Sequence, residues 1–80
     1  MILHNWIMSQ EVKISARKLL ALNIIKLRKS ANINKENLSL ALGLDNSYIS
    51  KLEKEKINIT LDKLEAIANY FNVEVSTLLK

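Results

Sequence analysis

Gly43 is the only glycine in this 80-residue sequence, which contains neither proline nor cysteine. Because the tight reversals of β proteins depend largely on glycine and proline, so few of them favour helices joined by short turns. Without cysteine there is no disulfide framework, no thiolate metal site and no cysteine nucleophile. The sequence therefore predicts an all-α fold whose sharpest turn lies at Gly43.

The length allows one domain with a modest core. A chain of this size buries only about 60% of its unfolded surface, so its core must be efficient or shared with a second subunit. The net charge of +4 favours polyanionic partners, although many soluble proteins are mildly basic. No segment approaches the length of a transmembrane helix, and the start, MILHNWIMSQ, lacks the basic region and cleavage site of a signal peptide. We expect a cytoplasmic, nucleoid-associated protein without membrane contact.

Apolar residues recur at helical spacing from residue 15 onward, whereas residues 1–14 lack a clean period. We interpret 1–14 as an N-terminal arm or an extra helical turn, and 15–80 as the folded domain. Asn32, Gly43 and Asn72 are expected to end helices in left-handed conformation. Helices are expected at 15–31, 34–42, about 46–54, 61–71 and from Ser76, with the first four capped by Ser15, Asn34, Asp45 and Thr60. The core is expected to contain Leu38, Leu42, Ile49, Leu52, Leu64, Ile67 and Phe71.

The third of these helices has two chemically different faces. At 3.6 residues per turn, Tyr48, Ile49 and Leu52 fall on one narrow arc. The opposite face carries small polar groups and lysines and no acid, which suits the major groove of DNA. There Asn pairs with adenine, Lys reaches guanine acceptors, and Ser donates or accepts. The residues of this face are Asn46, Ser47, Ser50, Lys51 and Lys54.

The turn before this helix explains how its polar face is presented. Gly43 supplies the positive φ that lets the chain reverse, and Asp45 can accept from the free amides of the next helix. Two helices joined in this way form a helix-turn-helix unit, whose second helix enters the major groove. A solvated helix face is the alternative interpretation of the same polar residues.

The stretch from about residue 23 to 79 resembles the phage-repressor/Cro-like helix-turn-helix family, also called the xenobiotic-response-element type. The motifs occur in the family's order: LRK, LALGL, SYISKLE, TLDKLEAIA and FNVEVSTLL. Within the family the chain is most similar to the controller proteins of restriction–modification systems, which share a GLD.SYIS phrase and a TLDKLE helix. The resemblance implies a compact five-helix bundle with a lambda-repressor-like DNA-binding domain.

The resemblance also implies roles for individual residues. Arg28 and Glu53 match a structural ion pair that joins the first and third helices. The family dimerises through its C-terminal helices and binds two half-sites about 34 Å apart. Asn46, Ser47, Ser50 and Lys51 match base-reading positions, whereas Lys35, Tyr48, Lys54, Lys56 and Asn58 match positions that contact the DNA backbone. For Tyr48, packing in the core is an equal alternative.

Glu55 departs from the family pattern, which has glycine there. A left-handed glutamate costs roughly 1 kcal/mol, so we expect the third helix to run slightly longer instead. The unit from residue 33 to 56 is formally neutral, because four lysines face four acids: Lys35, Lys51, Lys54 and Lys56 against Glu36, Asp45, Glu53 and Glu55. Affinity is therefore expected to depend on dimerisation, for which the candidate surface is Tyr70, Val75, Leu78 and Leu79.

These observations favour a sequence-specific regulator that binds double-stranded DNA. We expect a restriction–modification controller protein acting as a homodimer on its own pseudo-palindromic operator. The alternative is an antitoxin or phage-type repressor with a protein-partner role. No paired carboxylates or ligand cluster support catalysis, a cofactor, a metal or a small-molecule substrate.

Overall fold

The structure is a computed structural model that describes residues 15–80; the predicted arm lies outside these residues. The described part is all helical and contains no strand. The predicted all-α bundle is therefore confirmed, with the helices α2 (Ala16–Ser30), α3 (Lys35–Ala41), α4 (Tyr48–Glu53), α5 (Leu61–Tyr70) and α6 (Val75–Leu78).

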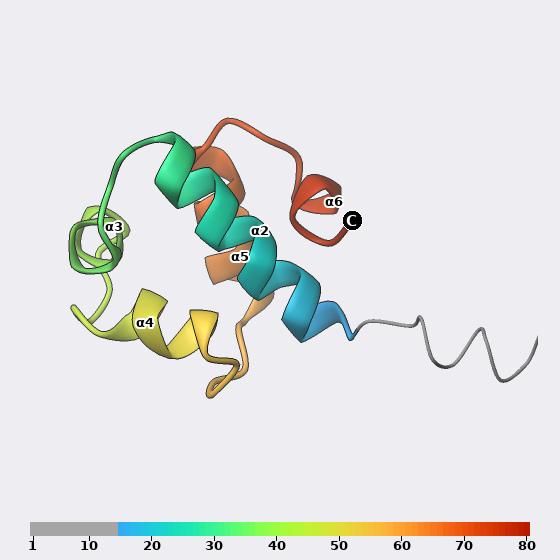
Figure 1. Cartoon of the computed structure of the whole chain (residues 1–80), viewed down its shortest axis with the longest axis horizontal. Coiled ribbons are helices and arrows are strands. Elements are labelled where there is room, and N and C mark those ends of the chain that lie inside the picture. The colour runs from blue at the N-terminus through green and yellow to red at the C-terminus, as the bar shows by residue number, and fades with distance from the viewer. Residues whose placement is uncertain (1–14) are drawn as a thin grey trace, which may run out of the picture.

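The longest helix, α2, occupies the middle of the bundle (Figure 1). α3 and α4 pack against each other on one side of it, and α4 also contacts α2. α6 and the C-terminus lie on the opposite side, where α6 contacts α2 and α5 (Figure 1). The helix-turn-helix unit therefore occupies one side of the molecule and the C-terminal helix the other.

Three of the predicted N-caps are present. In each case the side-chain oxygen of the cap accepts a hydrogen bond from the backbone N–H three residues later, which satisfies one free amide of the first turn. The pairs are Ser15 with Lys18, Asn34 with Asn37, and Thr60 with Lys63.

Four helices end with the same device. One residue takes a positive φ, and the next residue donates its N–H to the carbonyl five positions back, as in a Schellman motif. The left-handed residues are Asn32 (φ 56°), Gly43 (φ 73°), Glu55 (φ 60°) and Asn72 (φ 56°). The closing bonds are Ile33 to Arg28, Leu44 to Ser39, Lys56 to Lys51, and Val73 to Ala68. The prediction was right for Asn32, Gly43 and Asn72.

One core joins all five helices. Leu38 from α3 and Ile49 from α4 are fully buried, as is Leu78 from α6. Leu42 and Phe71, which were predicted to be core residues, are only partly buried and pack against its edge. The buried cluster comprises Leu20, Ile24, Leu38, Ile49, Leu52, Leu64, Ile67, Ala68 and Leu78.

None of the helices in residues 15–80 has the length and apolar character needed to cross a membrane.

Candidate nucleic-acid interface

The turn between α3 and α4 reverses the chain at Gly43. The Gly43 N–H donates to the Leu40 carbonyl at 2.9 Å, and the Leu44 N–H donates to the Ser39 carbonyl at 2.9 Å. A Cβ added at Gly43 would meet no heavy atom within 4 Å. Glycine is therefore favoured here by its φ of 73° rather than by a lack of space.

α4 begins at Tyr48, two residues later than predicted, and its N-cap position is Ser47. Asp45 was predicted to cap the helix itself. Instead its carboxylate accepts from the backbone N–H of Ser47 at 3.1 Å and from the Ser47 hydroxyl. These two hydrogen bonds, with a contribution from the charge of Lys51, lower the pKa of the Asp45 carboxyl. Asp45 therefore organises the turn before α4, and Asn46 and Ser47 belong to that turn.

The first turn of α4 is capped from the neighbouring helix. Its own N-cap, Ser47, makes no capping bond through its side chain. The hydroxyl of Ser39 on α3 instead accepts from the Ile49 N–H at 3.0 Å and donates to the Lys35 carbonyl at 2.9 Å. Ser39 is fully buried, so this hydroxyl joins α3 to α4 without contact with water.

Sequence reasoning missed Ser39. The helical register could have indicated that Ser39 is buried, because this residue directly follows the core residue Leu38 on the side of α3 that faces α4.

Two apolar residues and one tyrosine hold α4 against the bundle. Ile49 and Leu52 belong to the core. The Tyr48 ring packs against this core, and the ammonium of Lys63 lies 5.1 Å from its centroid. The Tyr48 hydroxyl oxygen is buried and has no hydrogen-bond partner in the described part of the chain, and burial raises the pKa of this phenol above 10.0. The buried hydroxyl favours the packing alternative for Tyr48, and its contact with the DNA backbone stays a prediction.

Of the four predicted base-reading residues, Asn46 and Ser47 lie in the turn before α4, and Ser50 and Lys51 lie within α4. Asn46 and Lys51 are exposed, whereas Ser47 and Ser50 are half-buried. The Asn46 amide donates to the Glu36 carboxylate at 3.5 Å, and the Ser47 hydroxyl is bonded to Asp45. The side chains of Ser50 and Lys51, by contrast, make no hydrogen bond to another of the described residues.

The ion pair implied by the resemblance is present. Arg28 Nε donates to Glu53 Oε2 at 2.8 Å, and Arg28 Nη2 donates to Glu53 Oε1 at 3.3 Å. Arg28 Nη1 also donates to the Ile33 carbonyl at 3.2 Å. The two side chains are only 11% and 7% exposed, so the pair fixes the last turn of α4 to α2 inside the bundle. It also neutralises Glu53, which reduces the negative charge of the helix-turn-helix unit.

Comparison with known proteins identifies this arrangement. A helix-turn-helix family model matches residues 24–78, which is more than half of the chain. The chain belongs to this family. Membership makes it a DNA-binding transcriptional regulator of the helix-turn-helix type. α4 is the second helix of the motif, the one called the recognition helix.

Two individual proteins are also similar to it. The chain is 33% identical to the control protein C.SmaI of Serratia marcescens over 63 residues, 79% of this chain and 75% of that protein. A hypothetical transcription factor from Neisseria, NHTF, has a crystal structure that matches with a TM-score of 0.79 and 32% identity. That match covers 82% of this chain and 76% of the other.

The segment after the recognition helix carries three of the four remaining predicted backbone contacts. Lys54, Lys56 and Asn58 are exposed, as is Lys35 at the start of α3. α4 ends at Glu53, and Glu55 has a φ of 60°. The expectation that this helix runs longer was wrong, because Glu55 takes the left-handed position in which the Lys56 N–H can close the helix on the Lys51 carbonyl at 2.9 Å.

The four residues of the predicted dimer surface differ in exposure. Tyr70 is 43% exposed and Leu79 is 37% exposed, while Val75 is half-buried. Leu78 is fully buried in the core of its own chain, so its side chain cannot contact a partner and its assignment to this surface was wrong. The described residues contain no group of three or more His, Asp or Glu side chains placed to hold a metal ion.

Proposed function

We propose that this protein is a restriction–modification controller that binds its own operator as a homodimer. The observation that carries the proposal is the presentation of α4. Ser39 and Arg28 anchor its two ends, and the side chains of Ser50 and Lys51 on its outer side have no hydrogen-bond partner within residues 15–80. The similarity to the control protein C.SmaI supports the controller assignment. Asn46, Ser47, Ser50 and Lys51 are proposed to read bases, and Lys35, Lys54, Lys56 and Asn58 to contact the backbone.

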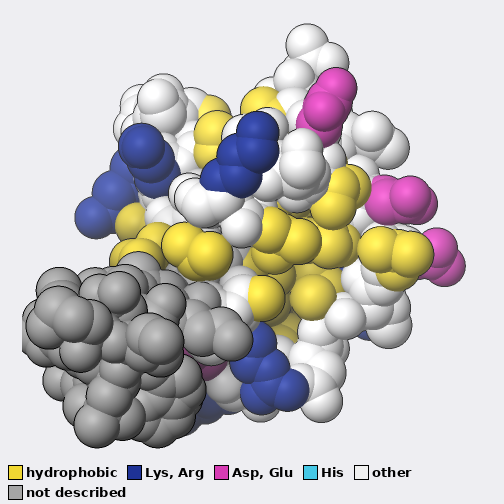
Figure 2. Space-filling model, turned by 90° about the vertical axis from the view of Figure 1, so that its right-hand side faces the viewer, with side chains coloured by type: hydrophobic (Ala, Val, Ile, Leu, Met, Phe, Trp, Pro, Cys, Tyr) yellow, Lys and Arg dark blue, Asp and Glu magenta, His cyan; other side chains and the backbone are white. Residues whose placement is uncertain are grey.

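The proposed dimer uses the side of the molecule opposite the helix-turn-helix unit. Figure 2 views the side of the molecule where α6 lies, and hydrophobic side chains gather near its centre. Tyr70 and Leu79 are the exposed large hydrophobics closest to the C-terminus, and Val75 lies between them in sequence. Pairing through this side leaves the two recognition helices free to enter successive major grooves about 34 Å apart.

DNA binding is tested by titrating the protein with the DNA upstream of its own gene. Saturable, sequence-selective binding is expected, and it should weaken steeply with salt because phosphate contacts release counterions. Ser50→Ala and Lys51→Ala should relax base preference, whereas Lys35→Ala should weaken binding to all sequences alike. Lys18→Ala, at an exposed position on α2, is the control. An equal loss on every sequence for Lys51→Ala would refute its base-reading role.

The homodimer is tested separately by sedimentation equilibrium. Tyr70→Ser with Leu79→Ser should shift the protein toward the monomer. Leu61→Ser is the control, since Leu61 is a 67% exposed apolar residue at the start of α5. If the Leu61 variant dissociates as readily as the double variant, the interface lies elsewhere.

A further inference from the structure

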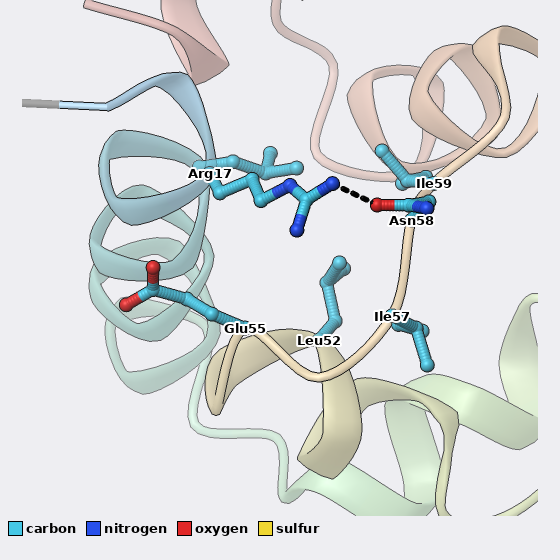
Figure 3. Close-up of a pocket in the computed structure, with 7 residues that line it drawn as sticks. Arg17, Leu52, Glu55, Ile57, Asn58 and Ile59 are labelled. Atoms are coloured by element: carbon cyan, nitrogen blue, oxygen red, sulfur yellow. Dashed lines mark hydrogen bonds between the residues drawn. The ribbon is translucent and has the colours of Figure 1, made fainter.

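A pocket of about 250 Å³ separates the start of α2 from the segment that follows the recognition helix. The side chain of Arg17 crosses this space from α2 toward Asn58 (Figure 3). Leu52 and Ile57 line its apolar part. The complete lining is Arg17, Leu20, Leu52, Glu55, Ile57, Asn58 and Ile59.

The guanidinium of Arg17 donates a hydrogen bond to the side-chain oxygen of Asn58 (Figure 3). Arginine has five N–H donors and no acceptor, so only the amide oxygen of Asn58 can face it. The amide nitrogen, with its two donor hydrogens, must then lie on the other side of the amide group. Asn58 is exposed and its nitrogen has no partner among the hydrogen bonds of the described residues. The contact with Arg17 thus leaves the two N–H donors of the Asn58 amide free to donate to a phosphate oxygen.

The contact is also the only hydrogen bond that links residues 54–60 to α2 in the described part of the chain. The other bonds of this segment run to α4 or to the start of α5, as in Lys56 to Lys51 and Lys63 to Thr60. Lys54, Lys56 and Asn58 all belong to this segment. Ile57 and Ile59 pack the segment against the core, and the hydrogen bond from Arg17, 41 residues away in sequence, fixes the side chain of Asn58 between them.

We propose that Arg17 is a positioning residue for DNA binding, which holds Asn58 with its amide donors directed toward the DNA backbone. The inference rests on the proposed function and adds to it a residue outside the helix-turn-helix unit. It assigns no base contact to Arg17, so its effect should be the same on every DNA sequence.

The test measures the affinity of Arg17→Ala, Asn58→Ala and the double variant for operator and unrelated DNA at several salt concentrations. Each single variant should lose on the order of fivefold in affinity on both DNAs, as expected for one hydrogen bond. The double variant should lose no more than either single one, because both remove the same contact. Asn58→Asp, which keeps an acceptor for Arg17 but no donor for phosphate, should bind no better than Asn58→Ala.

Lys18→Ala is the matched control, because Lys18 is the exposed neighbour of Arg17 and carries the same charge. It should leave affinity nearly unchanged, and all variants should melt close to wild type. A positioning role also predicts an unchanged salt slope for Arg17→Ala, whereas a direct phosphate contact would reduce the slope by about 1.

Three results would overturn the inference: equal losses for Arg17→Ala and Lys18→Ala, additive losses in the double variant, or a reduced salt slope for Arg17→Ala alone. Absence of any sequence-selective binding by the wild-type protein would instead refute the proposed function.

Discussion

The two ends of the recognition helix are held by different chemistry. At its N-terminal end, the chain turns at Gly43 and a buried neutral hydroxyl, that of Ser39, caps the Ile49 N–H. At its C-terminal end, the chain turns at Glu55 and an ion pair joins Glu53 to Arg28. Both turns need a left-handed backbone conformation. Glycine adopts it readily at position 43, whereas the glutamate at position 55 adopts it at a cost in free energy. The ion pair lies at the end of α4 whose turn contains the strained residue, Glu55.

The largest effect is expected from breaking the ion pair. Arg28→Ala should lower the free energy of unfolding by about 3 kcal/mol, because it leaves Glu53 largely buried without a partner. Chemical denaturation measures this loss. Lys29→Ala is the control, since the adjacent lysine is exposed. Equal stability of the two variants would show that the C-terminal end of α4 does not depend on the pair.

Removal of the Ser39 hydroxyl, which caps α4 from the neighbouring helix, should have the next largest effect. Ser39→Ala leaves the Ile49 N–H without its acceptor in a buried position, which should cost about 1 to 2 kcal/mol. Denaturation measures the cost, and Ser76→Ala at an exposed site is the control. Amide hydrogen exchange should accelerate first at Ile49 and its neighbours in α4. A loss of protection spread evenly over all helices would contradict a local capping role.

Most of the architecture was predictable because it depends on local rules. The caps at Ser15, Asn34 and Thr60 and the stops at Asn32, Gly43 and Asn72 follow from residue type and position. The start of α4 was less predictable, because its cap comes from Ser39 on another helix. Glu55 was mispredicted for a related reason: its backbone preference is overridden by the Schellman bond and by the anchoring of Glu53. Tertiary contacts decided both cases.

A reciprocal exchange at the two turns tests the comparison directly. Gly43→Ala should cost about 1 kcal/mol through its left-handed φ alone, since the added Cβ meets nothing. Glu55→Gly should instead stabilise the protein by about 0.5 kcal/mol, because relief of strain exceeds the added freedom of the unfolded chain. It should also tighten DNA binding by removing a negative charge beside Lys54 and Lys56. Destabilisation by Glu55→Gly would show that the left-handed glutamate costs less than the freedom that glycine adds to the unfolded chain.

The smallest effect concerns Asp45, in the turn that leads into the N-terminal end of α4. Its folded-state pKa is lowered from 3.8 by the hydroxyl and amide of Ser47, so the folded protein favours the carboxylate more than the unfolded chain does. The resulting stability is present above the unfolded pKa and is lost as pH falls through the lowered value. Asp45→Asn keeps an acceptor for the Ser47 N–H but cannot ionise. The stability difference between wild type and this variant should therefore be greatest at neutral pH and vanish in acid, as read from urea midpoints. Because Asp45 is exposed, the difference should be small, and a difference that grows as pH falls would reverse the assigned sign.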